Sequence, residues 1–82
     1  MKNLWIFDEK RLAILRELLR CDAARGCDIK ECLDIKKSLL SHHLGVLRDK
    51  GIVEERREGR EKYYRIRRGR RPFVKKVMAL VE

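Results

Sequence analysis

Residues 38–66 combine an amphipathic helix pattern with two short strand patterns that follow it directly. They read SLLSHHLGVLRDKGIVEERREGREKYYRI. In the first half, leucines recur at helical spacing up to Gly51, a residue that accepts the left-handed conformation found after helix ends. In the second half, two alternating runs flank a short loop containing Gly59, as in a β-hairpin. The stretch therefore predicts a helix followed by a two-stranded hairpin with an arginine-rich tip.

Helical patterns also lie before and after this stretch, and together they predict the order of the secondary-structure elements. The sequence predicts helices over 8–20, 27–33 and 36–50, a hairpin over 52–66, and a last helix over 72–81. Asp8 is expected to cap the first helix, the segment CDAARG is expected to be a loop, and Pro72 suits the first turn of the last helix. The order α-α-α-β-β-α is that of a winged helix-turn-helix, a mainly α fold with a small β-hairpin wing (α+β). Residues 1–82 are expected to form this single domain.

The charge of the chain is strongly positive and unevenly placed. The 82 residues carry a formal net charge of +9, and residues 54–76 hold eleven basic and four acidic side chains. Such a block attracts polyanions, so nucleic acid is the first candidate partner and an acidic membrane surface the second. No apolar run is long enough to span a bilayer and no leader pattern precedes Trp5. We therefore expect a cytoplasmic protein without a membrane partner.

The helix over 36–50 has two unlike faces. Leu40, Leu44 and Leu47 share one face and are expected to pack, while polar and basic residues share the other. A merely solvated helix would show the same pattern, but the adjacent hairpin clusters cations whose repulsion an anion would relieve. We expect the helix to enter a major groove of double-stranded DNA and the hairpin to flank it. The predicted DNA-binding residues are Lys36, Lys37, Ser38, Ser41, His42, Arg48, Arg56, Arg57, Arg60 and Lys62.

From about Cys27 to Ile66 the chain resembles the ArsR/SmtB family of small winged-helix repressors, whose pattern is similar to LxxSxSxxSxHLxxLxxxGLVxxxxxGRxxYY. The matching residues are Leu33, Ser38, Ser41, His43, Leu44, Leu47, Gly51, Ile52, Val53, Gly59, Arg60, Tyr63 and Tyr64. Two positions depart from the pattern, because Lys36 stands where the family has a capping Ser and Asp34 replaces a turn Gly. The resemblance implies a homodimeric repressor that binds an inverted-repeat operator and leaves it when a metal, metalloid, oxidant or other signal arrives.

The three cysteines leave the nature of such a signal open. Metalloid sensors of the family carry Cys-Val-Cys-Asp at the second helix, whereas residues 25–28 here read Arg-Gly-Cys-Asp. Cys32 falls on another face of that helix and is expected to be a small buried hydrophobe. Cys21 can fold back towards Cys27 as a thiol switch or a partial metal site, but two thiolates make a poor zinc site. We expect no cofactor, no metal site, no metal or metalloid effector, and no thiol on the DNA face.

Apolar residues at both ends of the chain suggest a second copy as a partner. A chain of 82 residues builds only a shallow core, so a partner chain would supply further apolar contacts. Packing of the two ends within one subunit is the alternative. The predicted dimer-interface residues are Trp5, Phe7, Phe73, Val77, Met78 and Leu80.

Two other function classes can be weighed against a transcriptional regulator. One is a winged-helix module that mediates protein or RNA contacts, which would bind through the C-terminal basic run and not through the helix face from Lys37 to Arg48. The other is an enzyme, but the sequence shows no nucleophile-base set, no phosphate loop and no paired-carboxylate motif. We therefore expect a regulator that binds a specific DNA sequence and no enzymatic activity.

Overall fold

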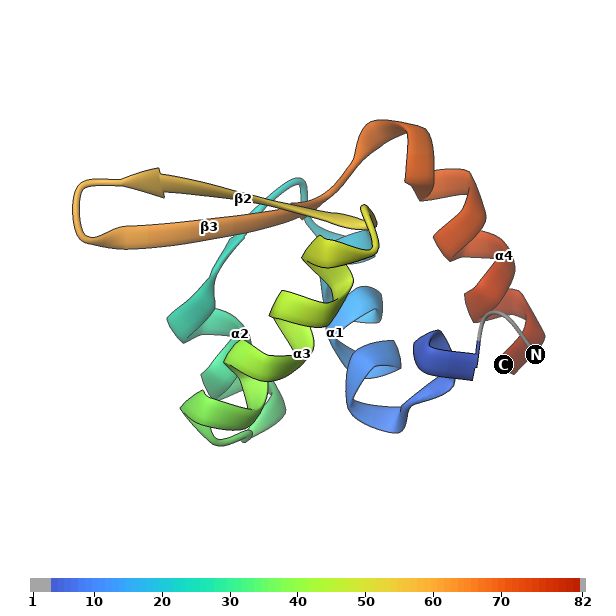
Figure 1. Ribbon diagram of the computed structural model, residues 1–82, viewed down its shortest axis with the longest axis horizontal. Coiled ribbons are helices and arrows are strands. Elements are labelled where there is room, and N and C mark those ends of the chain that lie inside the picture. Colours follow the sequence, from blue (N-terminus) through green and yellow to red (C-terminus); the bar gives the residue numbers. More distant parts are fainter. Residues whose placement is uncertain (1–3, 82) are drawn as a thin grey trace.

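The computed structural model describes residues 4–81, in which helices gather at one end and a hairpin extends away from them (Figure 1). The elements are, in order, η1 (Leu4–Phe7), α1 (Glu9–Arg20), β1 (Ala24–Arg25), α2 (Gly26–Leu33), α3 (Lys37–Asp49), β2 (Val53–Glu58), β3 (Glu61–Ile66), η2 (Arg68–Arg70) and α4 (Arg71–Val81). The predicted winged helix-turn-helix order is confirmed, and each predicted helix bound differs from the observed one by no more than one residue.

The sheet has one strand more than the sequence predicted. Ala24 and Arg25, expected to be in a loop, form β1 and pair antiparallel with Tyr64 and Tyr63 of β3. The strand order is β1-β3-β2, and β2 pairs with β3 along its whole length. A strand of two residues has no alternation to detect, and its pairing depends on the chain returning to it about forty residues later. β1 ties the α1–α2 connection to the base of the wing.

Local backbone chemistry explains where the helices begin and end. The Asp8 carboxylate accepts hydrogen bonds from the amides of Lys10 and Arg11, at 2.9 and 3.2 Å, which confirms it as the cap of α1. Asp34 ends α2 in the left-handed conformation, with φ 50° and ψ 53°, which its short polar side chain tolerates better than most. Lys36 precedes α3 and gives it no side-chain cap, as the departure from the family pattern predicted.

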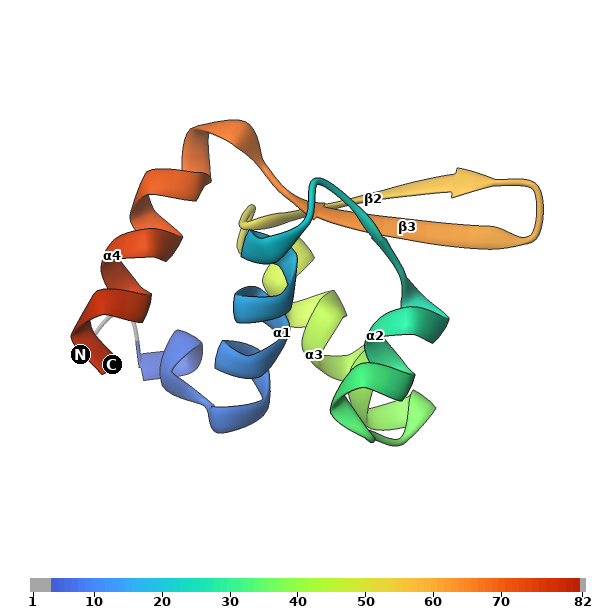
Figure 2. The ribbon, with the colours of Figure 1, turned by 180° about the vertical axis from the view of Figure 1, so that it is seen from behind.

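The core forms where α1 meets α3 and α4, and in the view of Figure 2 α1 lies in front of α3. Ile14, Leu15 and Leu18 of α1 are fully buried. The three leucines of α3 turn onto this core as predicted, and α4 adds Val74 and its neighbours one turn further on. The core therefore fixes α3 against α1 and leaves its opposite side to solvent. Within residues 4–81, no helix has both the length and the apolar character needed to cross a membrane.

Candidate nucleic-acid interface

The solvent side of α3 carries short polar and basic side chains. Lys37, Ser38 and Ser41 are exposed, and so is His42 one residue further on. These four side chains occupy the first two turns of the helix, where a helix lying in a groove of DNA makes most of its base contacts. Hydroxyl, imidazole and ammonium groups donate to or accept from base edges and phosphates.

A groove of about 470 Å³ runs between this part of α3, the start of α2 and the outer half of the hairpin. It is lined by Gly26, Cys27, Lys30, Lys37, Leu40, Ser41, Leu44, Arg57, Arg60, Glu61, Lys62 and Tyr64. We call it the basic groove. It joins Lys37 and Ser41 to three of the predicted hairpin residues, Arg57, Arg60 and Lys62, so the structure brings together the helix and hairpin parts of the predicted interface.

The cations of the basic groove have no anionic partners of their own. Within the described part of the chain, the side chains of Lys30, Lys37, Arg57, Arg60 and Lys62 form no ion pair or hydrogen bond. Glu61 is the only carboxylate in the lining. Arg57 and Lys62 even stand opposite each other on β2 and β3, an arrangement of like charges that destabilises a hairpin. A bound polyanion would relieve this repulsion.

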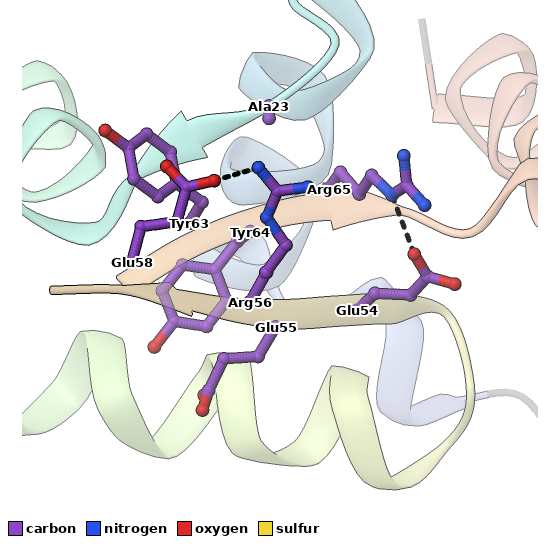
Figure 3. Close-up of a pocket in the computed structure, with 8 residues that line it drawn as sticks. All are labelled: Ala23, Glu54, Glu55, Arg56, Glu58, Tyr63, Tyr64 and Arg65. Carbon is purple, nitrogen blue, oxygen red and sulfur yellow. Dashed lines mark hydrogen bonds and ion pairs between the residues drawn. The ribbon is translucent and has the colours of Figure 1, made fainter. Parts of the chain in front are cut away.

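The outer face of the hairpin differs, because its charges pair with one another. A hollow of about 600 Å³ there is lined by Ala23, Glu54, Glu55, Arg56, Glu58, Tyr63, Tyr64 and Arg65 (Figure 3). Arg65 donates to Glu54 at 2.7 Å, and Arg56 pairs with Glu58. Of the predicted DNA-binding residues, Arg56 therefore lies away from the basic groove, with its charge already compensated.

Arg48 and Lys36 were also predicted to bind DNA, whereas Lys30 was not. Arg48 is exposed but held by Glu55 at 3.2 Å and by Asp49 at 3.7 Å, and Lys36 is exposed at the start of α3. Lys30 was not predicted, although it lines the basic groove. A single lysine on an eight-residue helix gives no pattern to follow, and only the fold shows that α2 faces the hairpin.

A buried histidine fixes α3 to the N-terminal end of α1. His43 is 5% exposed, and its Nδ1 accepts a hydrogen bond from Arg11 Nε at 3.0 Å. The Arg11 guanidinium also donates to the Trp5 carbonyl at 2.7 Å, while His43 Nε2 lies 3.8 Å from an Asp8 oxygen. Burial lowers the pKa of His43, and the nearby Asp8 carboxylate opposes that shift. Neutral His43 is the form that accepts the Arg11 hydrogen bond.

The cysteines lie in different surroundings from those predicted. Cys27 lines the basic groove, with its Sγ 4.0 Å from Glu61, so the expectation of no thiol beside the candidate interface is wrong for this residue. Cys32 is exposed and not buried, and a hydrogen bond to the Glu17 carboxylate raises its pKa. Cys21 donates to the Glu17 carbonyl at 3.3 Å, and burial raises its pKa. Both thiols therefore interact with Glu17, whereas the alternative left open by the sequence would bring Cys21 to Cys27.

All six predicted dimer-interface residues lie on α4 and η1. Val77 and Met78 are buried inside the subunit, where they leave no surface for a partner. Trp5 and Phe73 are half-buried against the same core. Leu80 and Phe7 are 77% and 41% exposed, and they are the members of the predicted set that remain available. The sequence could not separate the two groups, because an apolar helix face does not reveal what covers it.

Comparisons with known proteins agree with this geometry. The family model described as "Bacterial regulatory protein, arsR family" matches residues 8–55. Over 60 residues the chain is 37% identical to the cadmium resistance transcriptional regulatory protein CadC of Listeria innocua, covering 73% of this chain and 50% of that protein. Over 75 residues it is 36% identical to an uncharacterized HTH-type transcriptional regulator of Methanocaldococcus jannaschii, covering 92% of this chain and 81% of that one. The chain thus spans half the length of CadC.

A solved structure adds a comparison in three dimensions. The chain resembles the homodimeric winged helix-turn-helix DNA-binding domain of a possible ArsR-family transcriptional regulator from Mycobacterium bovis. The TM-score is 0.76 at 31% identity, and the match covers 95% of this chain and 68% of that one.

Proposed function

Because the chain belongs to the ArsR family of bacterial regulatory proteins, we propose that it is a transcriptional repressor that binds double-stranded DNA at a specific site. The basic groove is the observation that supports this most. It joins the polar face of α3, with Lys37, to four further cations on α2 and the hairpin, and none of these five has an ion pair within residues 4–81. A helix in a major groove and a wing on the backbone would need this arrangement. The proposal places the protein in the cytoplasm and includes no enzymatic activity.

The proposed repressor is a homodimer on an inverted repeat. A homodimeric relative and the exposed Phe7 and Leu80 support this part of the proposal. In a two-fold dimer, the two α3 helices would lie about 34 Å apart and enter successive major grooves on one side of the duplex. The site residues proposed for base contact are Ser41 and His42, and those proposed for phosphate contact are Arg57, Arg60 and Lys62.

The effector is a separate part of the proposal. Relatives are named as cadmium and arsenical resistance regulators, so they do not support the expectation that no metal or metalloid acts on this chain. Among residues 4–81, no three His, Cys, Asp or Glu side chains are placed to hold an ion together. We propose that a metal acting on this protein would need ligands from a second subunit or from residues outside that range.

Alanine substitutions on the helix and on the hairpin tip should separate base reading from phosphate binding. Ser41→Ala and His42→Ala should each lower the preference for the cognate site about tenfold while leaving non-specific affinity nearly unchanged. Arg60→Ala should weaken binding to all sequences and flatten the salt dependence by about one unit per lost phosphate contact. Anisotropy titrations with a duplex selected from random sequences, at several salt concentrations, measure these quantities.

Two results would contradict the proposed function. One is a monomer in analytical ultracentrifugation at tens of micromolar together with no preference for an inverted repeat. The other is an Arg60→Ala variant that changes sequence preference but keeps the wild-type salt slope. If the α3 variants bound normally and only the basic hairpin mattered, the module for protein or RNA contacts would be favoured.

Alkylation of the thiols should weaken DNA binding through Cys27 alone. A maleimide adduct on Cys27 would occupy the basic groove between α2 and the hairpin and keep a duplex from closing on it. We expect treatment with N-ethylmaleimide to lower the affinity of the wild type at least about tenfold and to leave Cys27→Ser unaffected. Cys21→Ser and Cys32→Ser are the matched controls and should remain sensitive. Sensitivity of Cys27→Ser equal to that of the wild type would contradict this placement.

A further inference from the structure

A second cluster of arginines lies at the end of the sheet opposite the hairpin tip. The chain leaves β3 there, turns through η2 and enters α4 (Figure 1). A hollow of about 380 Å³ at this turn is lined by Glu54, Arg65, Arg67, Arg68, Gly69 and Arg70. We call this surface the arginine turn. It shares no residue with the basic groove.

The backbone holds the arginine turn in a fixed shape. The Arg67 amide donates to the Ile52 carbonyl at 2.9 Å, which fastens the turn to the residue before β2. The Arg70 amide donates to the Arg67 carbonyl at 2.8 Å and closes the short η2 helix. A turn that is fixed in this way presents its side chains with little loss of backbone freedom on binding.

The arginine turn has an excess of positive charge, because Glu54 is the only carboxylate in its lining beside four arginines. Glu54 pairs with Arg65 at 2.7 Å and with Arg67 at 3.8 Å. Arg68 and Arg70 are exposed, and within residues 4–81 their side chains have no hydrogen bond or ion pair, although the charge of Arg68 also acts on Glu54. Two exposed guanidinium groups beside a hollow suit phosphodiester oxygens, which guanidinium binds in a bidentate manner.

We propose that the arginine turn is a second seat for a DNA backbone and that the protein can hold a second duplex there while the first lies in the basic groove. This inference rests on the proposed function, because it takes the basic groove as the first DNA site. The hairpin tip and the turn from β3 into α4 lie at opposite ends of the hairpin in both views (Figures 1 and 2). The basic groove and the arginine turn have no lining residue in common, so a duplex bound in the first would leave the residues of the second free. The second seat contacts phosphates only, and its binding is independent of sequence.

A bridging assay tests the second seat. Operator duplex is fixed to beads, protein is added to saturation, and retention of a labelled duplex without the operator is measured. Wild type should retain the labelled duplex, and Arg68→Ala with Arg70→Ala should reduce its retention about tenfold or more. Lys75→Ala with Lys76→Ala is the matched control, because it removes the same charge from exposed positions of α4 and should retain the labelled duplex as wild type does. Affinity for a single short operator duplex should be unchanged in both variants.

The outcomes separate this inference from the function on which it rests. Equal retention by wild type and the Arg68/Arg70 variant would overturn the second seat, since the labelled duplex would then be held by the basic groove of another subunit. Wild type that binds operator but retains no labelled duplex would overturn it as well. If the wild type did not bind operator, the proposed function would be contradicted.

The arginine turn can then be tested separately in the Arg57→Ala, Lys62→Ala variant. Adding Arg68→Ala and Arg70→Ala to this variant should lower its remaining affinity for a duplex at low salt about tenfold. An unchanged affinity would overturn the second seat.

Discussion

Replacing Arg57 and Lys62 together by alanine is expected to weaken binding to every duplex by about 100-fold to 1,000-fold at about 0.15 M salt. Both side chains line the basic groove, and neither has an ion-pair partner among the described residues. A homodimer would lose about four phosphate contacts, each carrying about 0.9 unit of salt slope, so the slope of log affinity against log salt concentration should flatten by about 3.6. Anisotropy titrations over a range of salt concentrations measure both quantities.

The matched control for this variant removes the same charge from the other face of the hairpin. Arg56 and Arg65 are already paired with Glu58 and Glu54, so replacing both by alanine should change the affinity less than about threefold. Equal losses in the two double variants would contradict the division of the hairpin into a DNA face and a self-neutralised face.

Replacing Arg57 and Lys62 by alanine should not destabilise the fold. Arg57 and Lys62 are direct cross-strand neighbours, and removing two like charges from opposite positions stabilises a hairpin. Thermal unfolding of the Arg57→Ala, Lys62→Ala variant should therefore occur at the wild-type temperature or above it. A fall in unfolding temperature would mean that the loss of binding reflects unfolding and not a lost contact.

Replacing His43 by alanine should lower the free energy of unfolding by about 2–3 kcal/mol near neutral pH. The substitution opens a cavity between α3 and α1 and leaves Arg11 Nε without its acceptor, while the Arg11 bond to the Trp5 carbonyl remains. His42, the exposed neighbour on the same helix, is the control, and its replacement by alanine should change the free energy of unfolding by less than about 0.5 kcal/mol. Urea denaturation of the two variants measures the difference. Similar losses would contradict the structural role of His43.

The stability of the protein should also depend on pH through His43. Burial holds the pKa of His43 below its usual 6.5, so below that pH the unfolded chain binds a proton that the native chain does not. The contribution of neutral His43 is complete above pH 6.5 and declines as the pH falls towards the lowered native pKa. Unfolding free energy measured by urea titration should therefore fall with acidification from about pH 6.5.

The variant His43→Gln separates the titration of His43 from that of the neighbouring Asp8 carboxylate. His43→Gln keeps an oxygen that can accept from Arg11 but has no proton to gain, so it should lose the slope below pH 6.5. Burial of Asp8 raises its pKa, but hydrogen bonds from the Arg11 and Lys10 amides outweigh that effect and leave the pKa below the usual 3.8. Stability from Asp8 is therefore lost only below pH 3.8, outside the window of His43. A slope as steep in His43→Gln as in wild type would contradict the assignment.

The sequence predicted what short-range patterns encode. Leucine spacing identified the buried face of α3, and Gly51, with φ 75°, ends that helix as predicted. Tyr64 and Ile66 are buried on the same side of β3, as the period of a strand requires. These features follow from the period of a helix or a strand and from the conformations that single residues tolerate.

Features that depend on distant segments were missed. The Arg11 partner of His43 lies 32 positions earlier in the chain, and no local pattern joins the two. Lys30 and Cys27 reach the basic groove because the hairpin folds over α2, which only the packing of the sheet reveals. Arg56 and Arg57 look equivalent in sequence, yet strand alternation sends them to opposite faces, and only the pairing with Glu58 shows which charge is already compensated.

The short strand β1 makes one part of the wing more stable than the other. It pairs with Tyr63 and Tyr64 only, so the middle of the hairpin is three strands wide and the tip has two strands alone. A two-stranded segment in water is marginally stable, and its amides open at a lower free energy than those of the core. In the proposed complex with DNA, the tip of the wing would therefore bend to follow grooves of different width. The α3 helix, held rigidly on the core, would discriminate between sequences.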